Sequence, residues 1–339
     1  MTSQTPGPTP ESTRGHTAAP LDPRTAAELC ARILDEVGRA VVGKRDRLTL
    51  VLAAVLAKGH VLVEDLPGLG KTLTARSLAQ VLGLDFARAQ FTPDLLPADL
   101  TGSFIYDQKR GEFDFRQGPI FTGLLLADEI NRTPPKTQSA LLEAMQERQV
   151  TVEGQTFALP DPFSVVATAN PIEYEGTYPL PEAQLDRFLM RVQFGYPTPD
   201  EEYDVLARRI DRQREETLLD AVTDSTGVRA LQAHVEAVRI DASVGRYCVD
   251  LATATRTHGH VLVGASPRGS LGLGLAARAM AVIAGRDYVV PEDVKGVARE
   301  VLGHRITIKP ELWMTQADGA SVVADVLGRV PTPAAIEQR

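Results

Sequence analysis

The segment that most constrains this chain is residues 64–72, which reads Glu-Asp-Leu-Pro-Gly-Leu-Gly-Lys-Thr. It follows an apolar run at residues 61–63, typical of a short buried strand, and it precedes a helical pattern over residues 72–82. Glycines between a strand and a helix let successive backbone N–H groups point at one anion, and the helix N-terminus adds partial positive charge. The segment therefore predicts a phosphate-binding loop.

Lys71 is predicted to supply a full positive charge to the outer phosphates of a nucleotide, and the Thr72 hydroxyl is the expected magnesium ligand. The usual motif has glycine at the position of Asp65, but Pro67-Gly68 can still form the turn. The alternative interpretation is a Gly/Pro-rich turn that binds nothing. The residues predicted to contact the nucleotide are Pro67, Gly68, Leu69, Gly70, Lys71 and Thr72.

A second motif, at residues 123–129, ends an apolar run with two carboxylates. The run is typical of a central strand, and ligands bind at the carboxyl ends of strands in open α/β sheets. Asp128 is therefore predicted to hold magnesium through its water shell, and Glu129 to act as the general base on an attacking water. The alternative is two solvated carboxylates at a strand terminus, which the phosphate-binding loop upstream makes less attractive.

Another apolar run, at residues 163–169, is followed by Asn170. Because parallel strands deliver their carboxyl ends to one edge of a sheet, Asn170 is predicted to lie beside the terminal phosphate. Its amide could bind the attacking water while remaining uncharged. Taken alone, Asn-Pro indicates only a turn, so this prediction depends on the two motifs before it.

Two arginines are candidate contacts for phosphoryl oxygens, which gain charge in the transition state. Arg187 precedes the last expected strand, and Arg268 begins a helix near the middle of the C-terminal part. An arginine offered by a neighbouring subunit can change a rate by about 10³ to 10⁵. From spacing alone, either arginine could equally form a surface ion pair.

Short apolar runs alternate with helical stretches up to about residue 196, which predicts an α/β fold with a parallel sheet flanked by helices. The expected strands are residues 61–63, 87–91, 124–127, 164–168 and 191–194, and β-hairpins are expected at 103–115 and 149–159. The later patterns are amphipathic and helical. The predicted units are a disordered tail (1–23), a nucleotide-binding core (24–196), a smaller α-helical domain (197–330) and a flexible C-terminus (331–339).

The composition of the 339 residues is that of a globular protein, with 43% hydrophobic and 24% charged residues. The net charge of −8 disfavours general attraction to nucleic acid or to anionic membranes. No apolar stretch is long enough to span a bilayer, and no apolar signal core follows the first residues. Cys30 and Cys248 are far apart and favour reduced thiols. These features together predict a cytoplasmic protein.

Long segments of the chain resemble the MoxR family of AAA+ ATPases. They are the phosphate-binding loop, residues 90–102 (Gln-Phe-Thr-Pro-Asp-Leu-Leu-Pro-Ala-Asp-Leu-Thr-Gly), residues 127–132, residues 169–171 and residues 175–188. The resemblance extends over about residues 26–307. Asp65 is common at its position in that family.

The resemblance implies an AAA+ core with a helical lid, assembled into rings, usually hexamers, with ATP and Mg²⁺ between subunits. It makes Lys71 and Thr72 the Walker A residues, and Asp128 and Glu129 the Walker B pair. By the same resemblance, Asn170 is similar to sensor 1, Arg187 to an arginine finger acting in trans, and Arg268 to sensor 2. Val42 and Gly43 match the segment beside the adenine. The family suggests chaperone-like maturation of client protein complexes, often with a von Willebrand factor A domain partner.

Three functions remain open at this stage. The first is an ATPase that remodels proteins, favoured by the complete catalytic set without an appended nucleic-acid module. The second is a nucleic-acid motor of the helicase type, which Lys109 and Arg110 at a hairpin tip keep open. The third is a nucleotide-gated scaffold without hydrolysis, against which the intact Asp128 and Glu129 argue. The identity of the client and the number of subunits in a ring do not follow from the sequence.

Overall fold

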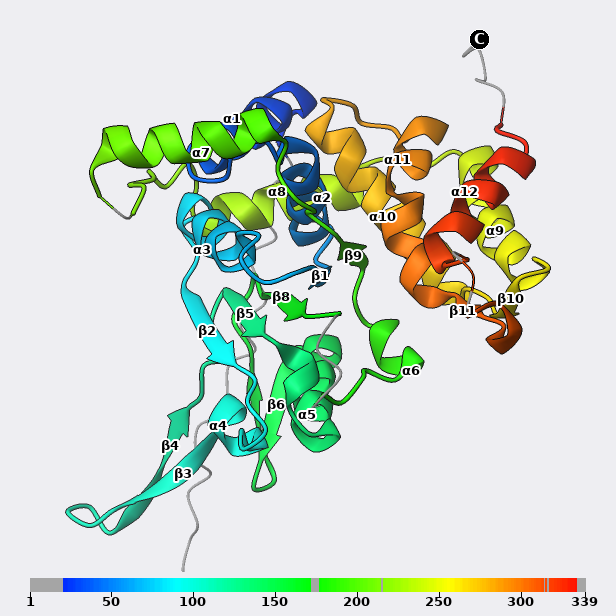
Figure 1. Cartoon of the computed structure of the whole chain (residues 1–339). Coiled ribbons are helices and arrows are strands. Elements are labelled where there is room, and N and C mark those ends of the chain that lie inside the picture. The colour runs from blue at the N-terminus through cyan, green and yellow to red at the C-terminus, as the bar shows by residue number, and fades with distance from the viewer. Residues whose placement is uncertain (1–20, 172–176, 215, 314, 316, 334–339) are drawn as a thin grey trace, which may run out of the picture.

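The computed structural model describes residues 21–171, 177–214, 216–313, 315 and 317–333 (Figure 1). The predicted tail and the predicted flexible C-terminus therefore lie mostly outside the described residues, as do residues 175 and 176 of the family resemblance. Within the described part, no helix is long and apolar enough to cross a membrane.

The centre of the fold is a parallel sheet of five strands in the order β2-β5-β8-β1-β9. All five expected strands are confirmed, each within two residues of its expected ends. Two β-hairpins, also confirmed, extend from the lower part of the molecule in Figure 1. The sheet strands are β1 (Val61–Glu64), β2 (Phe86–Gln90), β5 (Leu124–Asp128), β8 (Ser164–Ala169) and β9 (Met190–Val192), and the hairpin strands are β3 (Gly102–Asp107), β4 (Glu112–Gln117), β6 (Gln149–Val152) and β7 (Gln155–Ala158).

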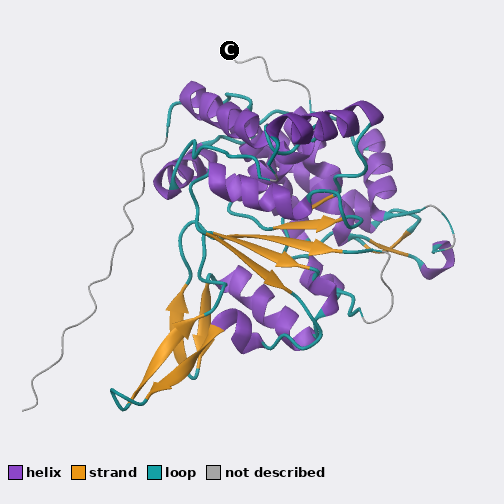
Figure 2. Cartoon of the chain, turned by 60° about the vertical axis from the view of Figure 1, so that its left-hand side comes forward, coloured by secondary structure: helices purple, strands orange, loops and turns teal. Residues whose placement is uncertain are grey.

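The central strands β1, β5 and β8 are largely apolar because both faces of the sheet are covered, as Figure 2 shows. Leu124 and Leu126 of β5 belong to one apolar cluster, while Leu125 and Ala127 belong to another on the opposite face. The first cluster includes α1 (Pro23–Gly38), α2 (Arg45–Leu56) and α3 (Lys71–Val81). The second includes α5 (Pro135–Glu147), and α4 (Pro97–Thr101) packs beside it.

The remaining chain is mostly helical, as expected. The helices are α6 (Glu182–Leu185), α7 (Pro199–Arg212), α8 (Ser225–Ala237), α9 (Ala242–Arg256), α10 (Pro267–Ile283), α11 (Pro291–Leu302) and α12 (Gly319–Arg329), with short 3₁₀ turns η1 (Ile130–Arg132), η2 (Gly303–Arg305) and η3 (Pro310–Leu312). A two-stranded antiparallel sheet, β10 (Val261–Val263) with β11 (Thr307–Ile308), was not expected.

The first apolar cluster continues from the sheet into the C-terminal helices. It joins Ile33 of α1 and Leu52 of α2 to Val235 of α8, Ala276 of α10 and Val326 of α12. Helices from the two ends of the chain therefore share one apolar core. Cys30 and Cys248 are buried free thiols within it, as expected.

Candidate active site

The carboxyl ends of β5, β8 and β1 lie side by side because these three strands are neighbours in the sheet. Glu64 pairs with Ala169, and Ala127 pairs with Ala167. The residues that follow the strands therefore emerge at one edge: the phosphate-binding loop after β1, Glu129 after β5, and Asn170 after β8. The structure brings together these three predicted parts of the site.

The phosphate-binding loop has the backbone shape that its glycines permit. Gly68 and Gly70 have φ angles of 82° and 77°, in the left-handed region that disfavours residues with a Cβ. No atom lies within 4 Å of an ideal Cβ at either position, so the backbone conformation is what requires glycine there. Helix α3 begins directly after the loop, at Lys71. The Lys71 ammonium donates to the backbone carbonyl of Asp65 at 2.5 Å.

The Asp65 side chain connects the start of this loop to the segment that follows β9. Its carboxylate accepts hydrogen bonds from the backbone N–H groups of Phe194 (2.5 Å) and Gly195 (2.8 Å). It also accepts one from the N–H of Leu66 at 3.2 Å. Asp65, which departs from the usual motif, therefore holds the loop against the segment after β9. The sequence did not reveal this role because the two partners lie about 130 positions away.

The hydroxyl of Thr168, on the neighbouring strand, contacts both residues of the Asp128-Glu129 pair. The Thr168 hydroxyl donates to Asp128 at 2.5 Å and accepts from the backbone N–H of Glu129 at 2.8 Å. Glu129 has a φ of 58°, which is uncommon for a residue other than glycine. Such backbone strain is often found at functional sites. The Thr168 hydroxyl stabilises this conformation and orients the carboxylate before it.

Both carboxylates also have partners on the strand at the sheet edge. The Arg88 guanidinium donates to one oxygen of Asp128 at 2.7 and 3.1 Å. The Gln90 amide donates to Glu129 at 2.6 Å, and the Arg132 guanidinium lies 3.4 Å from the same carboxylate. Sequence reasoning missed these residues, although a charged side chain inside a short strand is a signal that it has a partner.

Asn170 directly follows β8 and is buried, with 8% of its surface exposed. Its backbone carbonyl accepts from the Asn131 amide at 3.2 Å. This hydrogen bond connects the segment after β8 to the segment after β5. It therefore links the segments that carry Asn170 and Glu129.

The segment of Val42 and Gly43 lies where α1, α3 and α7 approach each other. Val42 lines a cavity of about 570 Å³ together with Leu73 of α3 and Val205 of α7. Gly43 has a φ of 70°, and a Cβ there would collide with the Glu201 carboxyl of α7. The positive φ therefore favours glycine at this position, and a larger residue would also displace the Glu201 side chain.

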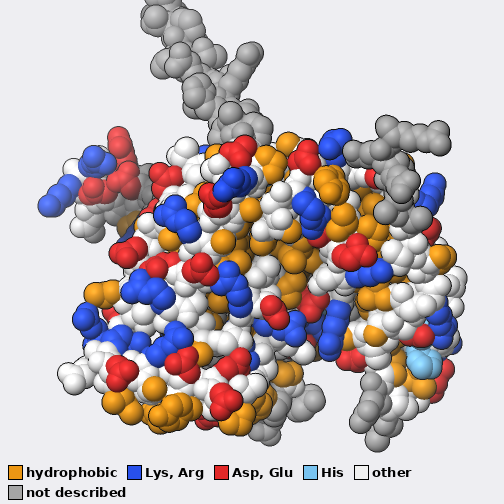
Figure 3. Space-filling model, turned by 90° about the horizontal axis from the view of Figure 1, so that it is seen from above, with side chains coloured by type: hydrophobic (Ala, Val, Ile, Leu, Met, Phe, Trp, Pro, Cys, Tyr) orange, Lys and Arg blue, Asp and Glu red, His pale blue; other side chains and the backbone are white. Residues whose placement is uncertain are grey.

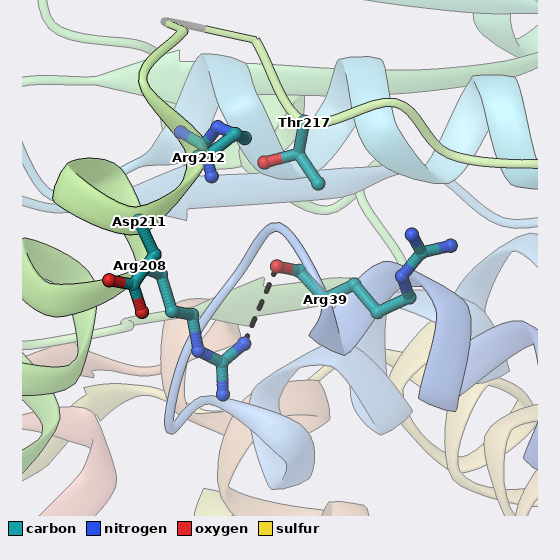
Figure 4. Close-up of a pocket in the computed structure, with 5 residues that line it drawn as sticks. All are labelled: Arg39, Arg208, Asp211, Arg212 and Thr217. Carbon is teal, nitrogen blue, oxygen red and sulfur yellow. Dashed lines mark hydrogen bonds between the residues drawn. The ribbon is translucent and has the colours of Figure 1, made fainter.

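An adjoining cavity of about 440 Å³ is lined by Arg39, Arg208, Asp211, Arg212 and Thr217 (Figure 4). The Arg208 guanidinium donates to the Arg39 carbonyl at 3.4 Å. Ion pairs with Glu36 and Asp204 offset the charges of Arg39 and Arg208. These arginines connect α7 to the end of α1.

Arg187 and Arg268 lie in a different place from the residues above. Both line a cavity of about 270 Å³ together with Lys58, Gly59 and His60, which directly precede β1. Arg187 itself precedes β9, and the N–H of Leu189 donates to the His60 carbonyl at 2.9 Å. The two arginines are thus at the amino edge of the sheet, opposite the phosphate-binding loop of the same chain.

Comparisons with known proteins show which proteins the chain is similar to. The model of the ATPase family associated with various cellular activities (AAA) matches residues 60–190, and that of the AAA lid domain matches residues 253–326. YeaC of Bacillus subtilis is 50% identical over 305 residues, which cover 90% of this chain and 95% of YeaC. The chaperone MoxR1 of Mycobacterium tuberculosis is 42% identical over 350 residues, which cover 97% of this chain and 90% of MoxR1.

The fold itself is also found in a solved structure. A crystal structure of a protein from Cytophaga hutchinsonii matches with a TM-score of 0.86 at 40% identity, and the match covers 92% of this chain and 97% of that one. The match extends from the parallel sheet through the C-terminal helices, so the resemblance seen in the motifs applies to nearly the whole chain. The chain therefore belongs to the MoxR family of AAA ATPases.

Proposed function

We propose that this protein is a magnesium-dependent ATPase whose active sites form between neighbouring copies of the chain in a ring. The observation that carries the proposal is the position of Arg187 and Arg268 at the amino edge of the sheet. Strand β1 has four residues and spans about 13 Å. Arginines at one end of it cannot reach phosphates held at the other end, so they would serve the nucleotide of an adjacent subunit.

The residues at the carboxyl edge fit an ATP–Mg²⁺ complex. Magnesium prefers oxygen ligands and is usually held by one or two protein groups together with phosphates and water. Asp128 and the Thr72 hydroxyl offer oxygen ligands of this kind. No cluster of three or more His, Cys, Asp or Glu side chains that could hold a metal occurs in the described part of the chain. This fits a metal that arrives with the triphosphate.

Each side chain then has a task in hydrolysis. Lys71 and the loop N–H groups would hold the outer phosphates, and Glu129 would take a proton from the attacking water. Asn170 would hold that water through its amide. The bound magnesium would offset the charge of the phosphate oxygens. Arg187 and Arg268 of the next subunit would stabilise the charge that develops in the transition state.

We further propose that hydrolysis drives chaperone-like remodelling of client protein complexes. The relative MoxR1 bears the name chaperone. The family resemblance supports a hexameric ring and a client such as a von Willebrand factor A domain protein. Acidic and basic side chains are intermixed on the face seen in Figure 3, which does not favour a nucleic-acid track there.

The proposal is tested by measuring ATP turnover of the wild type, Glu129→Gln and Arg187→Ala. We expect Glu129→Gln to bind ATP but to turn it over at least about 100-fold more slowly, because it lacks the base. Arg187→Ala should lose about 10³-fold or more if it acts as an arginine finger. Turnover equal to wild type in both variants would refute the mechanism. Turnover at the buffer blank in the wild type would instead favour the non-hydrolysing scaffold.

A further inference from the structure

The residue before the candidate arginine finger is joined to the C-terminal helices by a buried ion pair. The Asp186 carboxylate accepts from the Arg305 guanidinium at 2.7 Å through one oxygen. Its other oxygen accepts from the Ser266 hydroxyl at 3.0 Å. Arg305 ends the turn η2 after α11, and Ser266 precedes α10. One carboxylate thus connects the segment that carries Arg187 to two separate elements.

Arg305 also holds the backbone on both sides of Arg187. Its guanidinium donates to the carbonyls of Asp186 (3.3 Å), Phe188 (2.7 Å) and Leu189 (3.2 Å). Only 4% of its side chain is exposed. The Nε2 atom of the neighbouring His304 also lies 3.1 Å from the Phe188 carbonyl. The segment from Asp186 to Leu189 therefore has little freedom to move relative to η2.

Ser266 brings the second arginine into the same unit. It is the N-cap of α10, and its hydroxyl accepts from the backbone N–H of Arg268 at 3.1 Å. The same hydroxyl donates to Asp186. Arg187 is thus one peptide bond from a carboxylate that contacts the cap of the helix carrying Arg268. All four residues, Asp186, Arg187, Arg268 and Arg305, line the same cavity.

We propose that Asp186 and Arg305 are positioning residues that hold Arg187 and Arg268 as one rigid unit, so that both arginines reach the neighbouring subunit's phosphates together. This inference rests on the proposed function for its purpose. A buried ion pair adds little net stability compared with apolar side chains of the same size, but removing one partner is costly. The ion pair is therefore better explained by its effect on the positions of Arg187 and Arg268 than by a contribution to folding stability.

The experiment uses mixed rings in which only one kind of interface can work. Lys71→Ala subunits lack a functional phosphate-binding loop but keep both arginines. Arg187→Ala subunits keep the loop but lack the finger. Their mixture should regain ATP turnover, because loops of the second kind meet arginines of the first. Asp186→Asn is then added to one kind of subunit at a time.

Asp186→Asn in the arginine-donating subunit should lower the turnover of the mixture at least about 10-fold. The same change in the loop-donating subunit should leave at least half of that turnover, because the interface that this subunit's arginine side would serve is already inactive without Arg187. A purely structural role would lower both mixtures alike, and no role would lower neither; either result would overturn the proposal. Asp293→Asn is the matched control, since Asp293 forms a similarly buried ion pair with Arg286 in the same set of helices. Asp293→Asn should leave the ATP turnover of both mixtures unchanged.

A second measurement does not depend on activity. Spin labels at Ala183→Cys in α6 and Leu271→Cys in α10 report the distance between the two arginine-bearing segments within one subunit, with labelled chains diluted in unlabelled ones. The buried Cys30 and Cys248 should remain unlabelled, which the chain without added cysteines would verify. We expect a narrow distance distribution that becomes at least about twice as wide in Asp186→Asn and in Arg305→Lys, but not in Asp293→Asn.

The two measurements separate the two claims. If the Lys71→Ala and Arg187→Ala mixture regains no turnover, active sites shared between subunits are refuted, while the spin labels still test the rigid unit. If the distribution stays equally narrow in Asp186→Asn and Arg305→Lys, the ion pair does not hold the two segments together and the positioning role is refuted.

Discussion

At the scale of single residues, the role of Thr168 in positioning Asp128 and Glu129 can be tested. Thr168→Val keeps the shape of the side chain but removes the hydrogen bonds to Asp128 and to the N–H of Glu129. Since an unsatisfied buried group costs about 1–3 kcal/mol, we expect turnover to fall about 10- to 100-fold. Affinity for ATP should change only a few-fold. Steady-state turnover and equilibrium nucleotide binding measure the two effects.

Thr74→Val is the matched control for this substitution. Thr74 is also a buried threonine, but its hydroxyl has no hydrogen-bond partner among the described residues. Its replacement should leave turnover near that of wild type. Equal turnover in both variants would remove the organising role of Thr168.

His60 gives a prediction about pH. Its ring accepts from the N–H of Val165 (3.0 Å) and lies 3.1 Å from the Met145 carbonyl. Burial, and then the charge of Arg148, lower the pKa of His60 to about 3. Below about pH 6.5 the His60 ring therefore binds a proton in the unfolded chain but not in the folded chain. The free energy of unfolding consequently decreases as the pH falls from 6.5 towards 3.

The imidazole should accordingly stay neutral between pH 5 and 8. NMR titration of the His60 ring measures this directly, and His60→Gln should show a shallower loss of stability on acidification than wild type. A ring that titrates near pH 6.5 in the folded protein would contradict the expectation.

The local motifs were predictable at this scale, but the long-range partners were not. Lys71 begins a helix, Asp128 ends a strand and Asn170 follows one, and the apolar patterns of these elements are visible in the sequence, so their common edge could be inferred. Asp65 bonding to Phe194 and Arg305 bonding to Asp186 depend on contacts more than 100 positions apart. No periodicity in a single sequence encodes such pairs.

At the scale of elements, the contact between α7 and the segment after α1 can be tested at Gly43. Gly43→Ala places a Cβ at a φ of 70° and pushes against the Glu201 carboxyl. Glu201 would then lose its hydrogen bond from the Thr198 N–H, which caps α7. Gly154→Ala has a similar φ of 80° but open space around it. We expect Gly43→Ala to lower the free energy of unfolding by about 1 kcal/mol more than Gly154→Ala, as measured by denaturant unfolding.

The elements of the sheet and both hairpins could be predicted because apolar runs and turn residues mark them clearly. Strands β10 and β11 could not, since they have three and two residues and pair across more than 40 positions. Helix α7 shows a different limit. Its amphipathic pattern was visible, but its apolar side chains are exposed, with 56% for Leu206 and 62% for Ile210.

At the scale of the whole molecule, the proposed sharing of active sites between subunits would make activity depend on assembly, because the phosphate-binding loop and Arg187 and Arg268 lie at opposite edges of the sheet. Specific ATPase activity should rise with protein concentration and fall on dilution below the assembly range. Arg187→Ala should remain low at every concentration, although sedimentation would show the same assembly as wild type. Specific activity of the wild type that is independent of concentration while the assembled fraction changes would argue against shared active sites.

The shared apolar core also bears on how such an ATPase could do work. Residues of α1 and α2 pack into the same apolar cluster as residues of α8 and α10. A hinge that opened at the proposed boundary near residue 197 would therefore expose the apolar side chains of that cluster to water. Each 100 Å² of exposed apolar surface costs about 2.5 kcal/mol. A protomer built in this way is better suited to tilting as a whole against its neighbours than to bending internally, so motion produced by phosphate release would be passed around a ring from one stiff body to the next.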